Sequence, residues 1–198
     1  MNKLLSFILI LSSFSVLGQD TTIVFNNFKY KFGAKFLVDK SNDYSLVSEG
    51  STVTSGGVQI VRKFGKSRSS LESGVYIMSK AVGSGSSSIV YRNFSIPLIY
   101  RYDTKIFYIA GGIYADYLVE KKNNPKSYFY SSYRDRKLNL GLNLTLGIEK
   151  SISKQLSLLI EAHTINNLTS SKTDVDDLFS PSYSNNGFSI GINYKLLR

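Results

Sequence analysis

The stretch KLNLGLNLTLGIEK at 137–150 alternates without a break between apolar and polar side chains. Its even positions from Leu138 to Ile148 are all Leu or Ile, and the odd positions between them are Asn, Gly or Thr. A period of two residues predicts an extended strand with one apolar face and one polar face. Two environments suit such a strand: the apolar face lies inward in a soluble barrel, or outward against lipid in a membrane barrel.

The same alternation recurs along the chain and predicts eight strands. They cover 28–38, 58–64, 71–80, 94–102, 107–117, 138–148, 156–163 and 188–196. No segment after the N-terminus shows a convincing period of 3.6 residues, so we expect almost no helix there. The fold class that follows is all-β.

The predicted connections alternate between short and long. Short turns are expected at 65–69, 103–105 and 151–154, and longer polar loops near 39–53, 82–88, 121–136 and 167–185. Short turns at one end and long loops at the other are typical of outer-membrane barrels, whose short turns lie in the periplasm. An even number of strands places both termini at the short-turn end, and we expect that end to be periplasmic.

Three features favour a barrel with its apolar face outward. The apolar face of 138–148 is roughly 35 Å long at ~3.3 Å per residue, which a tilt near 40° reduces to about 27 Å, close to the ~25 Å lipid-facing band of such barrels. The opposite face carries small Gly, Asn and Thr side chains, which suit the narrow interior of an eight-stranded barrel. Aromatic residues stand near strand ends, as interfacial girdles require: Tyr100, Tyr102, Phe107 and Tyr194.

The sequence therefore predicts an eight-stranded antiparallel up-and-down transmembrane β-barrel. The alternative is a secreted, soluble, lipocalin-like carrier, which has the same number of strands and a similar size. Strict alternation also places Arg62 on the outer face. Because Arg62 is near a short turn, its long side chain can reach the lipid headgroups.

The N-terminus has the features of a secretory signal peptide. Lys3 precedes an apolar stretch at 4–17, and the small residues Val16 and Gly18 predict cleavage before Gln19. The alternative is a transmembrane helix, but the stretch is shorter than the ~20 residues that such a helix needs. We expect a signal peptide at 1–18 and a barrel domain at 19–198.

The stretch YRNFSIPLIYRYDTKIFYIAGGIYADYL at 91–118 carries a family resemblance. The run from Ile96 to Tyr102, the tight turn after it, and an aromatic strand containing Gly112 resemble the PorT-like outer-membrane β-barrel domain of Bacteroidetes, a porin-family barrel. This resemblance implies an eight-stranded barrel in the outer membrane and no single activity. Some relatives serve secretion or gliding machinery. Within this stretch, Pro97 cannot donate a ladder hydrogen bond, so we expect a bulge or a kink there.

Alternation places many charged side chains inside the barrel. The acidic ones are Glu72, Asp116, Glu149 and Glu161, and the basic ones are Lys29, Lys31, Lys35, Lys63, Lys80, Arg101 and Lys195. Because unpaired charges are costly in a narrow lumen, we expect them to pair across strands into a solid plug. The alternative is a cation-lined path that selects anions. The candidate lumenal charge network comprises Glu72, Arg101, Asp116, Glu149, Glu161, His163 and Lys195.

His163 is the sole histidine, and it lies two residues from Glu161. A histidine oriented by a carboxylate can act as a general base, as in a lipid acyltransferase built on a small barrel. A lone lumenal histidine is more often one member of a buried polar network. No phosphate-binding or dinucleotide motif is present, and no His–carboxylate cluster has metal-ligand spacing. We expect no enzymatic activity, no cofactor and no metal.

The third long loop, at 121–136, mixes basic and aromatic residues. They include Lys121, Lys122, Lys126, Tyr128, Tyr130, Arg134 and Arg136. Such mixtures can bind nucleic acid, but an outer-surface loop meets lipopolysaccharide phosphates first. A protein or glycan partner and a merely solvated loop are the alternatives.

These patterns together predict a monomeric, non-enzymatic protein of the outer membrane and cell envelope. Its expected role is that of a scaffold or interaction protein that presents surface loops, within a secretion or envelope machine. The expected partners are outer-membrane lipid, lipopolysaccharide and envelope proteins, and not nucleic acid. The main alternative is a porin-like barrel that binds or transports a small solute. The absence of Cys excludes disulfides and thiolate metal sites.

Overall fold

The computed structural model of the chain describes residues 28–43, 51–65, 67–82, 89–104, 106–123, 137–169 and 183–197. The predicted signal peptide, residues 1–18, lies outside these ranges. Among the described residues, no helix is long and apolar enough to cross a membrane.

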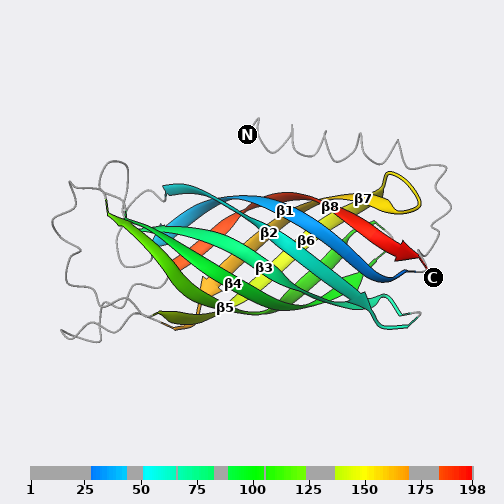
Figure 1. Ribbon diagram of the computed structural model, residues 1–198, viewed down its shortest axis with the longest axis horizontal. Coiled ribbons are helices and arrows are strands. Elements are labelled where there is room, and N and C mark those ends of the chain that lie inside the picture. The colour runs from blue at the N-terminus through cyan, green and yellow to red at the C-terminus, as the bar shows by residue number, and fades with distance from the viewer. Residues whose placement is uncertain are drawn as a thin grey trace, which may run out of the picture.

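The described residues form a closed antiparallel barrel of eight strands, each paired with its sequence neighbours and the last with the first (Figure 1). The strands are β1 Phe28–Asp43, β2 Ser51–Lys63, β3 Ser69–Val82, β4 Ile89–Asp103, β5 Tyr108–Asn123, β6 Leu138–Ser151, β7 Leu156–Asn167 and β8 Tyr183–Leu197. The predicted fold class, all-β with eight antiparallel strands, is confirmed.

Several strands are longer than the alternation of apolar residues indicated. β1 and β2 remain paired as far as Ser41 and Ser51, well inside the predicted first loop. β8 likewise begins at Tyr183 rather than near Phe188. The reason is that backbone pairing continues past the apolar outer band, where polar residues occupy both faces and the alternation no longer marks the strand.

The outer surface of the barrel is apolar, and its interior is polar. The six Leu and Ile residues of the opening stretch, Leu138 to Ile148, are 40–58% exposed. The polar side chains of Gln59, Asn93 and Asn193 are buried, with residue exposures of 3% or less. This arrangement is the reverse of a soluble barrel and matches the predicted orientation of the faces.

The start of β1 departs from strict alternation. A bulge between Phe28 and Tyr30 shifts the pairing with β8, so that Phe28 is buried and Lys29 is exposed. The prediction that Lys29 faces the lumen is therefore wrong, as is the outward placement of Phe28. A bulge adds one unpaired residue and redirects the side chains before it, which alternation alone does not reveal.

Pro97 interrupts the β3–β4 ladder, but no bulge occurs there. The β3–β4 register is the same on both sides of Pro97, with Ser73 opposite Leu98 and Tyr76 opposite Ser95. The ladder simply lacks the pairs between these positions, and the Ser73 hydroxyl donates to the Pro97 carbonyl at 2.8 Å. The register shift of β4 lies instead at Arg92–Asn93, on its pairing with β5.

The three connections that the structure describes are short and lie at one end of the barrel. They join β2 to β3, β4 to β5 and β6 to β7. In the first of them, Gly65 adopts a left-handed backbone with φ of 58°, a conformation that glycine favours in tight turns. The start of β1 and the end of β8 lie at the same end (Figure 1). This is the short-turn end, and the opposite end is the loop end.

Candidate functional site in the barrel interior

The candidate site is the interior, and the structure places all seven predicted network residues there. Residue exposures are 4% or less for Glu72, Arg101, Asp116, Glu161 and Lys195, and 7% for His163. The Glu149 side chain is 8% exposed. These residues do not form one continuous network. They separate into groups along the barrel axis, and each group uses partners from several strands.

Glu149 organises the group near the short-turn end. Its carboxylate accepts hydrogen bonds from the Lys31 ammonium at 2.9 Å, the Arg101 guanidinium at 2.6 Å and the Ser157 hydroxyl at 2.5 Å. Asn193 also donates to it at 3.4 Å. One carboxylate thus joins strands β1, β4, β6, β7 and β8, which charge-assisted hydrogen bonds hold together at this level.

Arg101 is fully enclosed in the same group. Its guanidinium also bonds Asp103 at 2.6 Å and stacks on the Tyr108 ring, 3.5 Å from the ring centroid. Arg101 therefore has two carboxylate partners and an aromatic face, which offsets the cost of burying the charge. Lys195 stands apart from these carboxylates, since its ammonium donates to the Ser151 hydroxyl at 2.6 Å.

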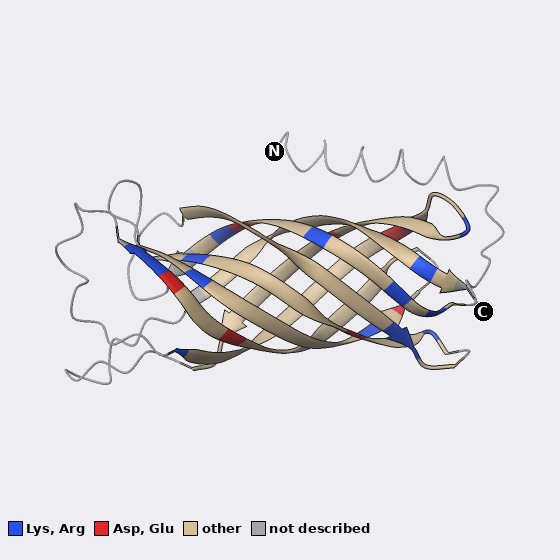
Figure 2. Ribbon diagram, in the orientation of Figure 1, with Lys and Arg blue, Asp and Glu red and all other residues tan. Residues whose placement is uncertain are grey.

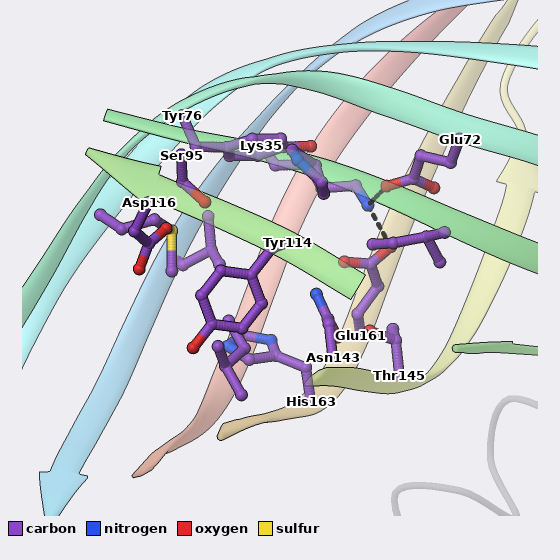
Figure 3. A pocket seen from close by; sticks show the side chains of 15 residues that line it. Lys35, Glu72, Tyr76, Ser95, Tyr114, Asp116, Asn143, Thr145, Glu161 and His163 are labelled. Atoms are coloured by element: carbon purple, nitrogen blue, oxygen red, sulfur yellow. Dashed lines mark hydrogen bonds and ion pairs between the residues drawn. The ribbon is translucent and has the colours of Figure 1, made fainter. Parts of the chain in front are cut away.

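Lys35 organises the middle of the barrel. Its ammonium lies 2.6 Å from Glu72 and 2.7 Å from Glu161, on opposite sides of the lumen (Figure 3). Glu161 is further bonded by the Tyr108 and Ser189 hydroxyls. Two carboxylates with one cation leave this level with excess negative charge, and the hydrogen bonds from the two hydroxyls stabilise the Glu161 carboxylate.

Lys80 organises the loop end. It bonds Asp116 at 2.5 Å, the Asn167 side-chain oxygen at 2.7 Å and the Tyr114 hydroxyl at 3.3 Å. Tyr114 also donates to Asn167. The group links β3, β5 and β7, so each end of the barrel, like its middle, is crossed by at least one buried ion pair.

His163 pairs with a carboxylate that sequence reasoning missed. Its Nε2 lies 2.6 Å from Asp39 of β1, and Glu161 instead serves Lys35. The proposed pairing of His163 with Glu161 is therefore wrong, because strand neighbours at i and i+2 share a face but diverge toward different partners. Asp39 is an odd-numbered residue of β1, like the inward-facing Lys31 and Lys35. Extending the predicted first strand past residue 38 would therefore have placed Asp39 inside the barrel.

A cavity separates the central group from the loop-end group. Its volume is about 40 Å³. Its lining combines apolar side chains with Lys35 and three carboxylates, and Figure 3 shows Glu72 and Glu161 beside Lys35 and Asp116 apart from them. Asp116 Oδ1 is buried without a protein partner among the described residues and lines this space.

The chemistry that the interior can perform is limited. Within the described part of the chain, no three His, Cys, Asp or Glu side chains gather as a metal site. His163 has no serine hydroxyl among its hydrogen-bond partners there, and its side chain is 2% exposed. A lipid substrate on the outer surface does not reach it, because the closed sheet lies between. The geometry is that of a packed polar core.

Most of the basic and aromatic loop lies outside the described residues. This applies to Lys126, Tyr128, Tyr130, Arg134 and Arg136. Lys121 and Lys122 are instead the end of β5. Lys121 lies over the Tyr91 ring, 5.6 Å from its centroid, and Lys122 is 3.5 Å from Glu120.

Comparison with solved structures finds small membrane barrels. Neisserial surface protein A matches with a TM-score of 0.51 at 13% identity, over 85% of this chain and 97% of that one. Outer membrane protein OprG of Pseudomonas aeruginosa matches with a TM-score of 0.48 at 11% identity, over 88% and 100% of the two chains. The N-terminal β-barrel domain of OprF from the same organism matches with a TM-score of 0.38 at 8% identity, over 83% and 97%.

The chain shares the fold of a small closed barrel. At this level of identity the likeness shows the fold and not the activity. No protein-family model matches the chain, and no curated protein matches it. The resemblance to PorT-like barrels therefore stays a prediction.

Proposed function

We propose that this protein is a non-enzymatic β-barrel of the bacterial outer membrane that serves as a scaffold or interaction protein. Its outer surface meets lipid, its interior is a plug, and its loop end presents the long connecting segments to partners. The observation that carries the proposal is the combination of an apolar exterior with ion pairs that cross the lumen at three levels.

The apolar exterior supports residence in a membrane. Side chains such as Ile113, Leu144 and Phe188 are more than half exposed, and similar residues cover all eight strands. Soluble monomers rarely expose a contiguous apolar patch larger than a few hundred Å². The exposed apolar surface of this barrel is far larger than that and would be unfavourable in water. The same observation disfavours the soluble, lipocalin-like alternative, whose apolar residues would line the interior.

The plugged interior supports a role other than conduction. Lys35 bridges Glu72 and Glu161 across the lumen, while Arg101 and Lys31 converge on Glu149. The cavity between the central and loop-end groups has a volume of only about 40 Å³. An eight-stranded barrel is also too narrow for an aqueous channel. These features disfavour the porin-like alternative.

Planar-bilayer recording tests the plug. The purified protein, with insertion verified by the heat-dependent shift of its gel mobility, is expected to give no discrete conductance steps. The triple variant Lys35→Ala, Glu72→Ala and Glu161→Ala removes the charged side chains of the central group. Its conductance is compared with that of the unmodified protein to measure leak through the lumen. Regular open-channel steps from the unmodified protein would favour the transport alternative and overturn the proposal.

Photo-crosslinking in intact cells tests the interaction role. A crosslinking residue replaces Lys122 at the loop end or Ile152 in a short turn, both of which are exposed. We expect a discrete adduct with an envelope protein or with lipopolysaccharide from the Lys122 position and none of the same mass from Ile152. Identical adducts from both positions, or none from either, would contradict a loop-end interaction surface.

A further inference from the structure

We propose that the outer surface of β8, β1 and β2 at the short-turn end binds one anionic phospholipid, with Lys29 and Arg62 holding its phosphate. This inference rests on the proposed membrane location and assigns a ligand class that the scaffold role does not require. The ligand is a lipid with a net negative headgroup, of the phosphatidylglycerol type.

The two cations converge because of the bulge in β1. Strict alternation would send Lys29 into the lumen, but the register shift between Phe28 and Tyr30 leaves it exposed on the outer surface. Its ammonium lies 5.5 Å from the centroid of the Tyr30 ring. Tyr30 is directly opposite Arg62 of β2, which is also exposed. The bulge therefore brings Lys29 to the outer surface that also carries Arg62, with Tyr30 next to Lys29 in the chain and opposite Arg62 across the strands.

Neither cation has a carboxylate partner among the described residues. The acidic groups nearest this end are committed elsewhere, since Asp103 bonds Arg101 and Glu149 bonds Lys31 inside the barrel. Two outward cations at the loop end differ, because Arg92 lies 3.0 Å from Glu120 and Lys122 lies 3.5 Å from the same carboxylate. Lys29 and Arg62 thus remain free to bind an anion.

An apolar surface for acyl chains begins directly beside the two cations. Phe32 is the next outward residue of β1, and its neighbours are Ile60 on β2 and Tyr194 on β8. These three side chains are 46%, 36% and 42% exposed. Cations beside an aromatic ring, followed by an apolar strip, match a phosphate headgroup followed by hydrocarbon.

Other exposed lysines lack this arrangement. Lys40 at the loop end is exposed, but its cross-strand neighbours are Thr52 and Asn186, which are polar. Figure 2 shows basic residues at both ends of the barrel. Lys150, near the end of β6, and Lys154, in the connection to β7, also lie at the short-turn end. The site is distinguished from these by Tyr30, which contacts Lys29 and is paired with Arg62, and by the strip of Phe32, Ile60 and Tyr194.

Native mass spectrometry of the folded protein, released from micelles containing equimolar phosphatidylglycerol and phosphatidylcholine, tests the site. We expect the unmodified protein to retain phosphatidylglycerol preferentially. Lys29→Gln with Arg62→Gln should lower the ratio of bound phosphatidylglycerol to phosphatidylcholine at least fivefold, since each basic residue near an anionic surface contributes about that factor. Arg62→Lys should retain most of the preference.

Two control variants remove the same charge elsewhere. Lys150→Gln with Lys154→Gln removes two positive charges from the short-turn end, at β6 and its connection to β7. Lys40→Gln with Lys137→Gln removes two positive charges from the loop end. We expect the lipid ratio to stay within a factor of two in both. An equal fall in either control, an unchanged ratio in the Lys29 and Arg62 variant, or displacement of the lipid by inorganic phosphate would overturn the proposal.

A separate measurement distinguishes failure of the lipid site from failure of the membrane assignment. Insertion into phosphatidylcholine vesicles with and without phosphatidylglycerol is followed by heat-dependent gel mobility. Insertion into both vesicles without lipid preference would overturn only the lipid site. Failure to insert into either vesicle would overturn the membrane location, and this inference with it.

Discussion

At the scale of single residues, the barrel interior depends on a few side chains that each satisfy several others. Lys35 is the central example, because one ammonium forms ion pairs with both Glu72 and Glu161. Glu149 has the converse role near the short-turn end, where it accepts from two cations. Buried pairs of this kind contribute little net stability as long as they are complete, but removing one member leaves a buried charge uncompensated.

This asymmetry predicts a large effect for Lys35→Met. The variant leaves two carboxylates buried without their cation, and we expect it to lower the free energy of unfolding by about 3–5 kcal/mol. Lys40→Met on the same strand is the control, because Lys40 points outward and makes no ion pair among the described residues. Urea unfolding of the refolded barrel in micelles measures both. Equal, small losses in the two variants would contradict the bridging role of Lys35.

At the scale of strands, small residues on β6 make room for tyrosines on β5. Gly147 is directly opposite Tyr108, and Gly141 is directly opposite Tyr114. A Cβ atom added at Gly147 would lie 2.4 Å from the Tyr108 ring, and one at Gly141 would lie 2.3 Å from the Tyr114 ring. The rings therefore lie over glycine, which lets their hydroxyls pass over β6 and reach Glu161 and Asn167 on β7.

Gly147→Ala is accordingly expected to destabilise the barrel. The added methyl group must displace the Tyr108 ring and with it the bond to Glu161, and overpacking of this kind costs about 1–3 kcal/mol. Gly111→Ala on β5 is the matched control, since its Cβ would lie 3.6 Å from Leu144, an ordinary contact. Unfolding in urea compares the two. A loss for Gly111→Ala as large as that for Gly147→Ala would argue against the glycine–tyrosine packing.

At the scale of the whole molecule, the orientation of the faces decides what the surface can touch. Leu144 lies near the middle of β6 and is 58% exposed, whereas Ile152 is 64% exposed in a short turn. In water these two positions would respond alike to a charge. In a bilayer they differ, because Leu144 faces hydrocarbon and Ile152 lies beyond the strands.

Leu144→Arg is therefore predicted to lower the stability of the vesicle-inserted barrel by about 2–4 kcal/mol, while Ile152→Arg costs about 0–1 kcal/mol. Reversible urea unfolding in phosphatidylcholine vesicles measures the difference. Equal effects at the two positions would show that the leucine face does not meet lipid.

The sequence alone was sufficient to predict the all-β class, the eight strands and the face of nearly every residue in them. Alternation predicts these features because side chains in a strand point to opposite sides at every step, whatever the partner strand. The inward placement of Glu72, Arg101, Asp116, Glu149, Glu161, His163 and Lys195 follows from the same rule.

Only the tertiary structure decided which inward groups meet. His163 pairs with Asp39 rather than Glu161, and Lys29 points outward because of a bulge. Both outcomes depend on strand register, which brings residues from distant parts of the chain to one level of the barrel. A local pattern carries no information about register, because sliding two strands past each other by two residues preserves every face and changes every partner.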